Sequence, residues 1–241
     1  MNLFPSLFHH SGGAIYHWRA LKNVRKLWSP HREQTRAFLD EWNPKSESIT
    51  LIGPSGGYSL PKAWLKKFKS ITAFEPDPIA RKIFEWRTGT KPHWIKTPFR
   101  FEDLRNGSLT LSPKSAVLFC NLLGQLDFDE EAGLLAQEEL CKLTESHELA
   151  SYHDVLSGND FRFEWTSPMD GDEPIRVKYE MEALDGYFNA NEGITELDLH
   201  VHPAAFLFQD QDLFRYQYWE WQITKKQTQV IEGAYALKPK D

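Results

Sequence analysis

The sequence predicts an α/β fold, in which helices cover both faces of a doubly wound, mostly parallel sheet. Compact apolar runs alternate with helix-like segments from residue 48 to about residue 158. A helical region precedes the first run, and an aromatic, strand-like region follows the last. Parallel neighbours need a covering crossover, so this alternation indicates parallel pairing, whereas the final region indicates antiparallel strands.

Two helices are expected before the first strand. Residues 14–28 carry apolar side chains at helical spacing, and Pro30 is placed to begin a second helix over residues 30–42. We therefore predict an N-terminal helical cap over residues 1–45. A single α/β domain is predicted over residues 46–241, with a β-rich, aromatic part from about residue 159.

The strands and helices of the main domain are predicted from apolar runs and from the glycines and prolines that bound them. The predicted strands are residues 48–54, 70–76, 92–96, 115–123 and 148–156, then strand-like runs at 162–165, 174–184, 197–208 and 216–237. The predicted helices are residues 59–68, 78–89 and 128–147, where Pro78 begins one helix and Gly89 ends it. In the last run, alternation places Tyr216 and Tyr218 on one face and Trp219 and Trp221 on the other, with at least one face in the core.

Composition narrows the class of protein. The 241 residues have a net charge of −6, which disfavours binding to nucleic acid or to anionic membranes. No apolar run approaches the roughly 20 residues of a membrane-spanning helix, and Cys120 and Cys141 suggest reduced thiols. These features predict a cytoplasmic protein. A local basic patch is interpreted as a solvated helix face; it comprises Lys22, Arg25, Lys26, Arg32 and Arg36.

A glycine-rich turn and an acidic strand end carry the chemistry. Gly53, Gly56 and Gly57 lie where the first strand turns toward its helix, so the backbone there can approach a ligand closely. Glu75 ends the next strand, at a spacing typical of a carboxylate that accepts hydrogen bonds from ribose hydroxyls. Together these features predict a nucleoside site; the alternative is a tight turn and a surface glutamate.

These residues resemble a known family. The runs GPSGGYSL and ITAFEPDP resemble the cofactor-binding half of class I S-adenosylmethionine-dependent methyltransferases, and AFEPDP is locally similar to the FkbM-type group. SAVLFCNLLGQL is similar to the family's fourth-strand region, and residues 216–233 to its two-stranded ending, whose last strand enters the sheet antiparallel. The resemblance implies a Rossmann-like fold, S-adenosylmethionine as cofactor, and methyl transfer.

The resemblance also implies site residues. Four residues match the loop beside the methionine part of the cofactor: Gly53, Ser55, Gly56 and Gly57. Glu75 matches the residue that holds the ribose, Pro76 and Asp77 would border the adenine, and Asn121 and Leu122 would lie near the transferred methyl.

This sequence departs from the family pattern in three places. Hydrophobic or hydroxyl residues, Thr50 to Ile52, stand where the first strand usually has an acid. Arg100 stands where many members have an aspartate near adenine, with Glu102 or Asp103 as possible substitutes. NLLG replaces the Asn-Pro-Pro-aromatic box of enzymes that methylate base amino groups. We therefore expect the acceptor to be a small molecule or a protein side chain.

A general base would help a hydroxyl or ammonium acceptor lose its proton. His153 and Asp154, at the end of the fifth strand, are the candidates; the alternative is a hydrogen-bonded histidine and a turn-capping aspartate. Candidates for a lid over the cofactor are His9, His10, Tyr16, His17, Trp18 and Arg19; the alternative for the first dozen residues is a disordered terminus. His200 and His202 alternate on one strand without a third ligand at a diagnostic spacing, so no metal is predicted.

Two other functions remain open. One is a nicotinamide-dependent oxidoreductase, which is disfavoured by the imperfect GxGxxG spacing and by the lack of a recognisable catalytic Tyr-x-x-x-Lys motif. The other is a non-catalytic binding or scaffold protein that retains the fold, which the missing first-strand acid and Arg100 favour.

Overall fold

The computed structural model describes residues 14–126, 129–159, 200–201, 207–208 and 213–237. The helices are α1 (Ala14–Asn23), α2 (Ser29–Trp42), α3 (Lys62–Leu65), α4 (Pro78–Thr88), α5 (Phe101–Arg105) and α6 (Glu130–Ser146), with a 3₁₀ turn, η2, at Leu123–Gln125. The strands are β1 (Ser48–Ile52), β2 (Ser70–Phe74), β3 (His93–Ile95), β4 (Ala116–Cys120), β5 (Leu149–Asn159), β6 (His200–Val201), β7 (Phe214–Gln222) and β8 (Gln227–Ala236).

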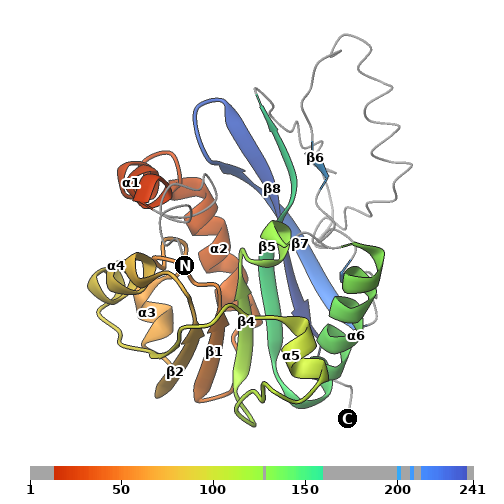
Figure 1. Cartoon of the computed structure of the whole chain (residues 1–241). Coiled ribbons are helices and arrows are strands. Elements are labelled where there is room, and N and C mark those ends of the chain that lie inside the picture. Colours follow the sequence, from red (N-terminus) through yellow and green to blue (C-terminus); the bar gives the residue numbers. More distant parts are fainter. Residues whose placement is uncertain (1–13, 127–128, 160–199, 202–206, 209–212, 238–241) are drawn as a thin grey trace, which may run out of the picture.

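These strands form one sheet in the order β3-β2-β1-β4-β5-β8-β7, with β6 paired to the far end of β5 (Figure 1). β1 to β5 run parallel to one another, β8 runs antiparallel to β5, and β7 runs antiparallel to β8. The predicted doubly wound α/β class, with two helices before the first strand and an antiparallel ending, is confirmed.

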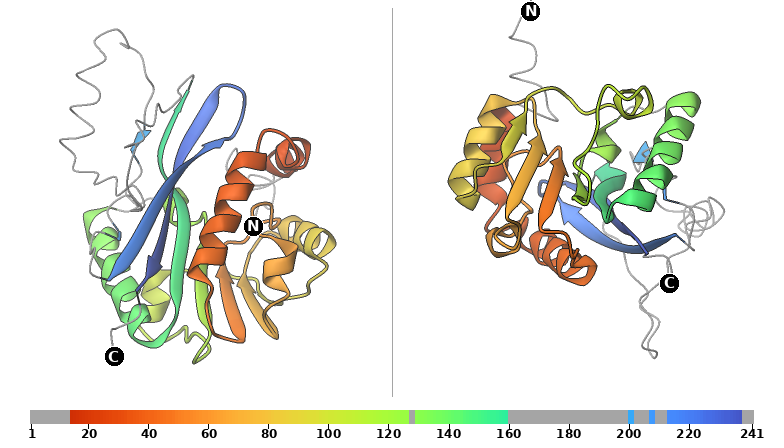
Figure 2. Two further views of the ribbon diagram at one scale, coloured as in Figure 1. Left: turned by 180° about the vertical axis from the view of Figure 1, so that it is seen from behind. Right: turned by 90° about the horizontal axis from the view of Figure 1, so that it is seen from below.

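Helices cover the two faces of the sheet (Figure 2). On one face, α2, α3 and α4 enclose a core that includes Phe38, Trp64 and Phe84. On the other face, α5 and α6 enclose a second core that includes Phe101, Phe119 and Leu140. Because both faces are covered, the central strand β4 is apolar along its whole length, and every one of its residues is buried.

The C-terminal hairpin joins the first of these cores. Trp219 and Trp221 of β7 are buried there, whereas Tyr216 and Tyr218 lie on the opposite face and are partly buried, so the predicted alternation is confirmed. Trp28, fully buried before α2, stacks edge-on against Trp221 with 4.9 Å between ring centroids. Its indole N–H donates to the carbonyl of Ile223 at 3.1 Å. These contacts attach the N-terminal cap to the C-terminal hairpin.

Two elements differ from the sequence-based expectation. The helix predicted over residues 59–68 is the single turn α3, because one turn already buries Trp64 and Leu65, and the indole N–H of Trp64 finds the carbonyl of Leu39. The short helix α5 was not predicted; its Phe101 is buried against Phe99 and Phe119. The strand-like runs 162–165 and 174–184 lie outside the described residues. None of the helices in the described part of the chain is long and apolar enough to cross a membrane.

Candidate functional site

The glycine loop turns sharply at the carboxyl end of β1. Gly53 has a φ of 67°, in the left-handed region that side chains rarely adopt. A Cβ at Gly53 would stand 3.0 Å from the Cβ of Leu122, which follows β4. Two predicted cofactor positions from separate motifs therefore lie against each other, and glycine allows this close approach.

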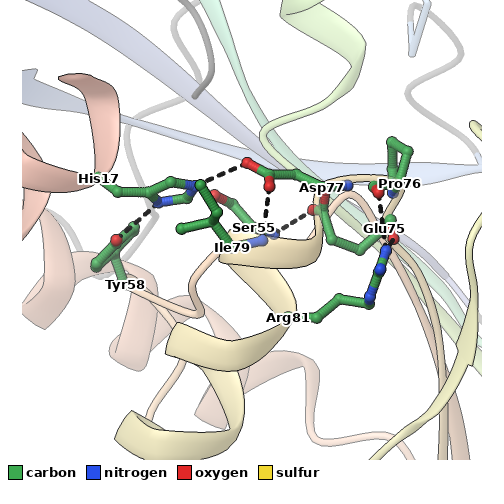
Figure 3. Close-up of polar contacts among 8 residues, drawn as sticks. All are labelled: His17, Ser55, Tyr58, Glu75, Pro76, Asp77, Ile79 and Arg81. Carbon is green, nitrogen blue, oxygen red and sulfur yellow. Dashed lines mark hydrogen bonds and ion pairs between the residues drawn. The ribbon is translucent and has the colours of Figure 1, made fainter. Parts of the chain in front are cut away.

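Glu75 lies directly after β2 and is bound by the backbone around it. The N–H of Ser55 donates to Oε2 at 2.9 Å, and the N–H of Asp77 donates to Oε1 at 3.0 Å (Figure 3). The side chain is only 7% exposed, and this burial raises its pKa, although the two N–H groups oppose the shift. A carboxylate accepts about four hydrogen bonds, so these two donors leave capacity for two hydroxyl groups.

Arg81 of α4 fixes the backbone at the same point. Its Nη1 donates to the carbonyls of Glu75, at 2.7 Å, and Pro76, at 2.8 Å. The turn between β2 and α4 is thus held twice: Arg81 donates to its carbonyls, and the Glu75 carboxylate accepts the N–H of Asp77 (Figure 3).

Asp77 links α4 to the N-terminal cap. Its Oδ1 accepts from the N–H of Ile79 at 2.7 Å, which caps α4, and its Oδ2 lies 3.0 Å from Nε2 of His17 in α1. Nδ1 of His17 lies 2.8 Å from the hydroxyl of Tyr58, just beyond the glycines. Burial raises the pKa of Asp77, but the bonds from His17 and Ile79 outweigh it, so the pKa is lowered. Asp77 is therefore held ionised.

Of the lid candidates, Tyr16 and His17 contact the glycine loop region, whereas Trp18 does not. Burial raises the pKa of Tyr16 to about 12, opposed by a hydrogen bond with the Ser55 side chain. The ring packs against Tyr58 and Trp28. Trp18 is 66% exposed, and the lid candidates His9 and His10 lie outside the described residues.

The ends of β4 and β5 are joined by Asn121. Its N–H donates to the carbonyl of Tyr152 at 2.7 Å, and its side-chain oxygen accepts from the N–H of Asp154 at 3.1 Å. Asp154 is 2% exposed, and its Oδ2 accepts from Gln229 of β8 at 2.9 Å. Gly124 lies so close that any Cβ there would collide with Asp154. Asn121, Leu122 and Asp154 are thus neighbours at one edge of the sheet.

His153 faces the other side of β5. It is fully buried, with Nδ1 2.9 Å from the hydroxyl of Ser151 and Nε2 3.6 Å from Oε1 of Glu232. Burial raises the pKa of Glu232 to about 8, and the hydroxyl of Tyr218 donates to its other oxygen at 2.6 Å. Although His153 and Asp154 are adjacent in sequence, strand alternation separates them, so they do not form a pair.

Other candidates lie elsewhere. Arg100 is exposed just before α5, which packs against α6. Within the described ranges, no three His, Cys, Asp or Glu side chains are grouped closely enough to hold a metal ion; His202 lies outside those ranges.

Sequence reasoning missed Arg87, Arg81 and Tyr58. Arg87 of α4 donates to the carbonyls of Gly56, at 3.1 Å, and Gly57, at 2.6 Å, and its guanidinium lies 4.8 Å from the centroid of the Tyr58 ring. Tyr58 could have been noticed as an aromatic residue directly after the glycines. Arg87 gives no such signal, because nothing in the local sequence marks an arginine 30 residues later as a partner of the loop.

Comparisons with known proteins give a short sequence match and several structural ones. No protein-family model matches the chain. It is 35% identical over 57 residues to a tRNA U34 carboxymethyltransferase of Wolinella succinogenes; the match covers 24% of this chain and 19% of that protein. The chain therefore spans only about a fifth of this curated relative.

Among solved structures, the N-methyltransferase NodS from Bradyrhizobium japonicum WM9 is 10% identical with a TM-score of 0.47, covering 88% of this chain and 98% of that one. The magnesium protoporphyrin IX methyltransferase from Synechocystis PCC 6803 with bound S-adenosylhomocysteine is 8% identical with a TM-score of 0.46. The match covers 90% of this chain and 94% of that one. The order and direction of the strands identify the fold. A parallel β1–β5 sheet closed by an antiparallel hairpin is the architecture that the resemblance implied, and the chain has the fold of class I S-adenosylmethionine-dependent methyltransferases.

Proposed function

We propose that the protein is an enzyme that transfers a methyl group from S-adenosylmethionine to an acceptor. One observation carries the proposal: the carboxylate of Glu75 is held by the backbone N–H of Ser55 in the glycine loop. The loop and the acidic strand end, 20 residues apart, thereby form one site at the carboxyl edge of the sheet. In open α/β sheets, ligands bind at this edge.

The residues present fit the cofactor. Glu75 keeps two accepting positions for ribose hydroxyls, while the glycine loop lies against Leu122, where the methionine part would lie. Pro76 and Asp77 would border the adenine, and Asn121 would lie near the methyl. His17 and Tyr16 would place α1 beside the nucleoside and exclude water there.

When bound, the cofactor supplies an electrophilic methyl group, so the protein's task is to align the acceptor and, for a hydroxyl or ammonium, to take up its proton. Of the two predicted bases, Asp154 is the one that neighbours Asn121. His153 is fully buried on the other face and would act only through other groups. We therefore assign proton uptake, where the acceptor requires it, to Asp154.

The acceptor class has two candidates. The sequence favours a small molecule or a protein side chain, since the chain lacks an Asn-Pro-Pro-aromatic box and has a net charge of −6. The curated relative is named as a tRNA-modifying enzyme, which favours RNA as the second candidate. Activity screens against metabolites, cell-extract proteins and total RNA would separate them.

Calorimetry with S-adenosylmethionine, S-adenosylhomocysteine and NAD tests the cofactor. We expect binding of the first two in the micromolar range, as is usual for such sites (about −8 kcal/mol). Binding of NAD alone would replace the proposal with an oxidoreductase. Binding of none would leave the scaffold function.

The substitution Glu75→Gln tests the site itself. It removes the charge while keeping the size, so we expect S-adenosylhomocysteine to bind roughly tenfold to a hundredfold more weakly, as for loss of hydrogen bonds to a charged group. Glu85→Gln on α4 is the matched control, since its amide oxygen can still accept from the Trp94 indole. Thermal melts without ligand check that both variants fold. Equal affinities in the two variants would remove Glu75 from the site.

A further inference from the structure

Charge is strongly segregated along this chain. Residues 1–96 contain 16 Lys and Arg against 7 Asp and Glu, a net charge of +9, whereas the remaining residues contain 12 against 27, a net charge of −15. The N-terminal part is therefore basic although the net charge of the whole chain is −6. Because salt screens charges beyond about 8–10 Å, a partner responds to the local field rather than to the total.

Five basic residues lie on α1, on the turn after it, at the start of α2 and on α4, and we call them the basic face: Lys22, Arg25, Lys26, Arg32 and Arg87. Within the part of the chain that the structure describes, no carboxylate lies within ion-pair distance of any of them. Other basic residues in the same region do have acidic partners, as in Arg36–Asp40 and Lys82–Glu85. Among the described residues, the charge of the basic face is thus not neutralised by acidic partners.

Two arginines of the basic face are held by backbone carbonyls: Arg32 by Val24, after α1, and Arg87 by Gly56 and Gly57. The pKa of Arg87 is lowered first by burial and then by the neighbouring charges of Arg32 and Arg25. Arg32 donates through Nη1 to the carbonyl of Val24 at 3.1 Å, while its buried Nε finds no hydrogen-bond partner in the part of the chain that the structure describes. Like charges held together without counter-charges favour an anionic ligand.

Two exposed tryptophans flank these cations. Trp18 of α1 is 66% exposed, and Nζ of Lys22 lies 5.2 Å from the centroid of its ring. Trp86 of α4 is 76% exposed. It is three residues after Ile83, which lies beside Gly56 of the glycine loop, so the two side chains are neighbours on the surface of the helix. A flat ring beside a cation is the arrangement on which unpaired bases stack in single-stranded nucleic acids.

The basic face also borders the candidate cofactor site. Arg87 donates to the carbonyls of Gly56 and Gly57, and His17, next to Trp18, contacts Asp77. In Figure 1, α1 and α4 lie on the same side of the sheet. A polyanion held on this face would thus lie beside the predicted methyl donor.

We propose that the basic face binds the phosphate backbone of a single-stranded RNA segment, with Trp18 and Trp86 stacking on its bases. The binding of RNA does not depend on the proposed function. The further step, that this RNA is the methyl acceptor, rests on the proposed function. The guanidinium groups match phosphate geometry, and the rings give the face a base-stacking capacity that a free phosphate or an acidic peptide would not use.

Fluorescence anisotropy with a labelled single-stranded RNA of about 20 nucleotides tests the face, at salt concentrations between about 50 and 200 mM. For Lys22→Glu with Lys26→Glu, we expect affinity to fall by about tenfold or more and the salt slope to decrease by about 2. The matched control is Lys66→Glu with Lys69→Glu, which changes the net charge equally but lies at the amino end of β2. The control pair should stay within about twofold of the unmodified protein.

The tryptophans test the recognition of bases. Trp18→Ala and Trp86→Ala should each weaken RNA binding by roughly fivefold to a hundredfold, as measured for lost base stacking. Equal losses in the two lysine pairs, no RNA binding at all, or binding only to vesicles that contain phosphatidylserine would each overturn the proposal. Calorimetry with S-adenosylhomocysteine on the same variants separates the two proposals, because the basic-face variants should retain cofactor binding even where RNA binding is lost.

Discussion

At the scale of single residues, two buried glutamates meet different surroundings. Glu75 lies at the edge of the sheet, where the N–H groups of Ser55 and Asp77 are available to it. Glu232 lies within the β5–β8 ladder, where strand pairing engages the backbone donors, and it relies on the Tyr218 hydroxyl. Burial raises the pKa of both, and that of Glu232 reaches about 8. The first carboxylate is suited to binding, the second to holding a proton.

Glu232 should make stability depend on pH. The folded protein keeps this proton up to about pH 8, whereas the unfolded chain releases it near the ordinary value of 4.5. Between these values the folded state binds more protons, so the free energy of unfolding falls as pH rises, by a few kcal/mol at most, and levels off above pH 8. Glu232→Gln should remove this fall, matching the unmodified protein at pH 5 and exceeding its stability at pH 9.

Urea unfolding at several pH values measures this difference. Glu145→Gln, on the exposed side of α6, is the control and should follow the pH profile of the unmodified protein. Parallel profiles for Glu232→Gln and the unmodified protein would show that Glu232 titrates normally in the fold.

At the scale of elements, α1 is attached to the sheet through polar contacts rather than through a wide apolar face. Ile15, Trp18 and Leu21 are exposed, while His17 and Ala20 are buried. His17 bridges Asp77 at the start of α4 and Tyr58 after the glycine loop. One side chain therefore couples the cap to both halves of the candidate site.

His17→Ala should loosen α1 selectively. Losing both hydrogen bonds should cost about 1–2 kcal/mol of global stability and speed amide exchange in residues 14–23 more than in α2. Hydrogen–deuterium exchange read by mass spectrometry measures this. Leu21→Ala, an exposed change on the same helix, is the control; equal exchange of α1 in the two variants would contradict the role of His17.

At the scale of the whole molecule, the cap and the sheet share one core. Trp28 joins the start of α2 to the C-terminal hairpin through Trp221 and the carbonyl of Ile223. Phe38 of α2 lies against Trp219 and Tyr235 of the same hairpin. The predicted boundary at residue 45 is thus crossed by buried contacts.

The chain should accordingly unfold in one transition. Trp28→Phe removes the bond to Ile223 and leaves space in the core, so we expect a loss of about 1–3 kcal/mol in a transition that is still single. Circular dichroism and tryptophan fluorescence during urea unfolding should coincide. Trp86→Phe, at an exposed site, should leave stability unchanged. Two separate transitions would mean that the cap folds independently.

Part of the candidate site could be predicted because its signals are local. Gly53 and Glu75 stand at strand ends, and parallel strands bring their carboxyl ends to one edge. The general base was less predictable: strand alternation puts His153 and Asp154 on opposite faces of β5, but the sequence does not show which face reaches the site. Neither the role of Arg87 nor the contact of His17 with Asp77 could be predicted, because contacts across 30 and 60 residues follow from helix packing.

The sequence by itself determined the order of strands and helices, since apolar runs, prolines and glycines act over a few residues. It also determined the segregation of charge, which is visible when each part of the chain is counted separately. Only the tertiary structure decided which charges remain without partners, which side of β5 reaches the site, and how α1 meets Asp77. Those outcomes depend on the packing of distant segments, where burial and the available hydrogen-bond donors set the behaviour of each group.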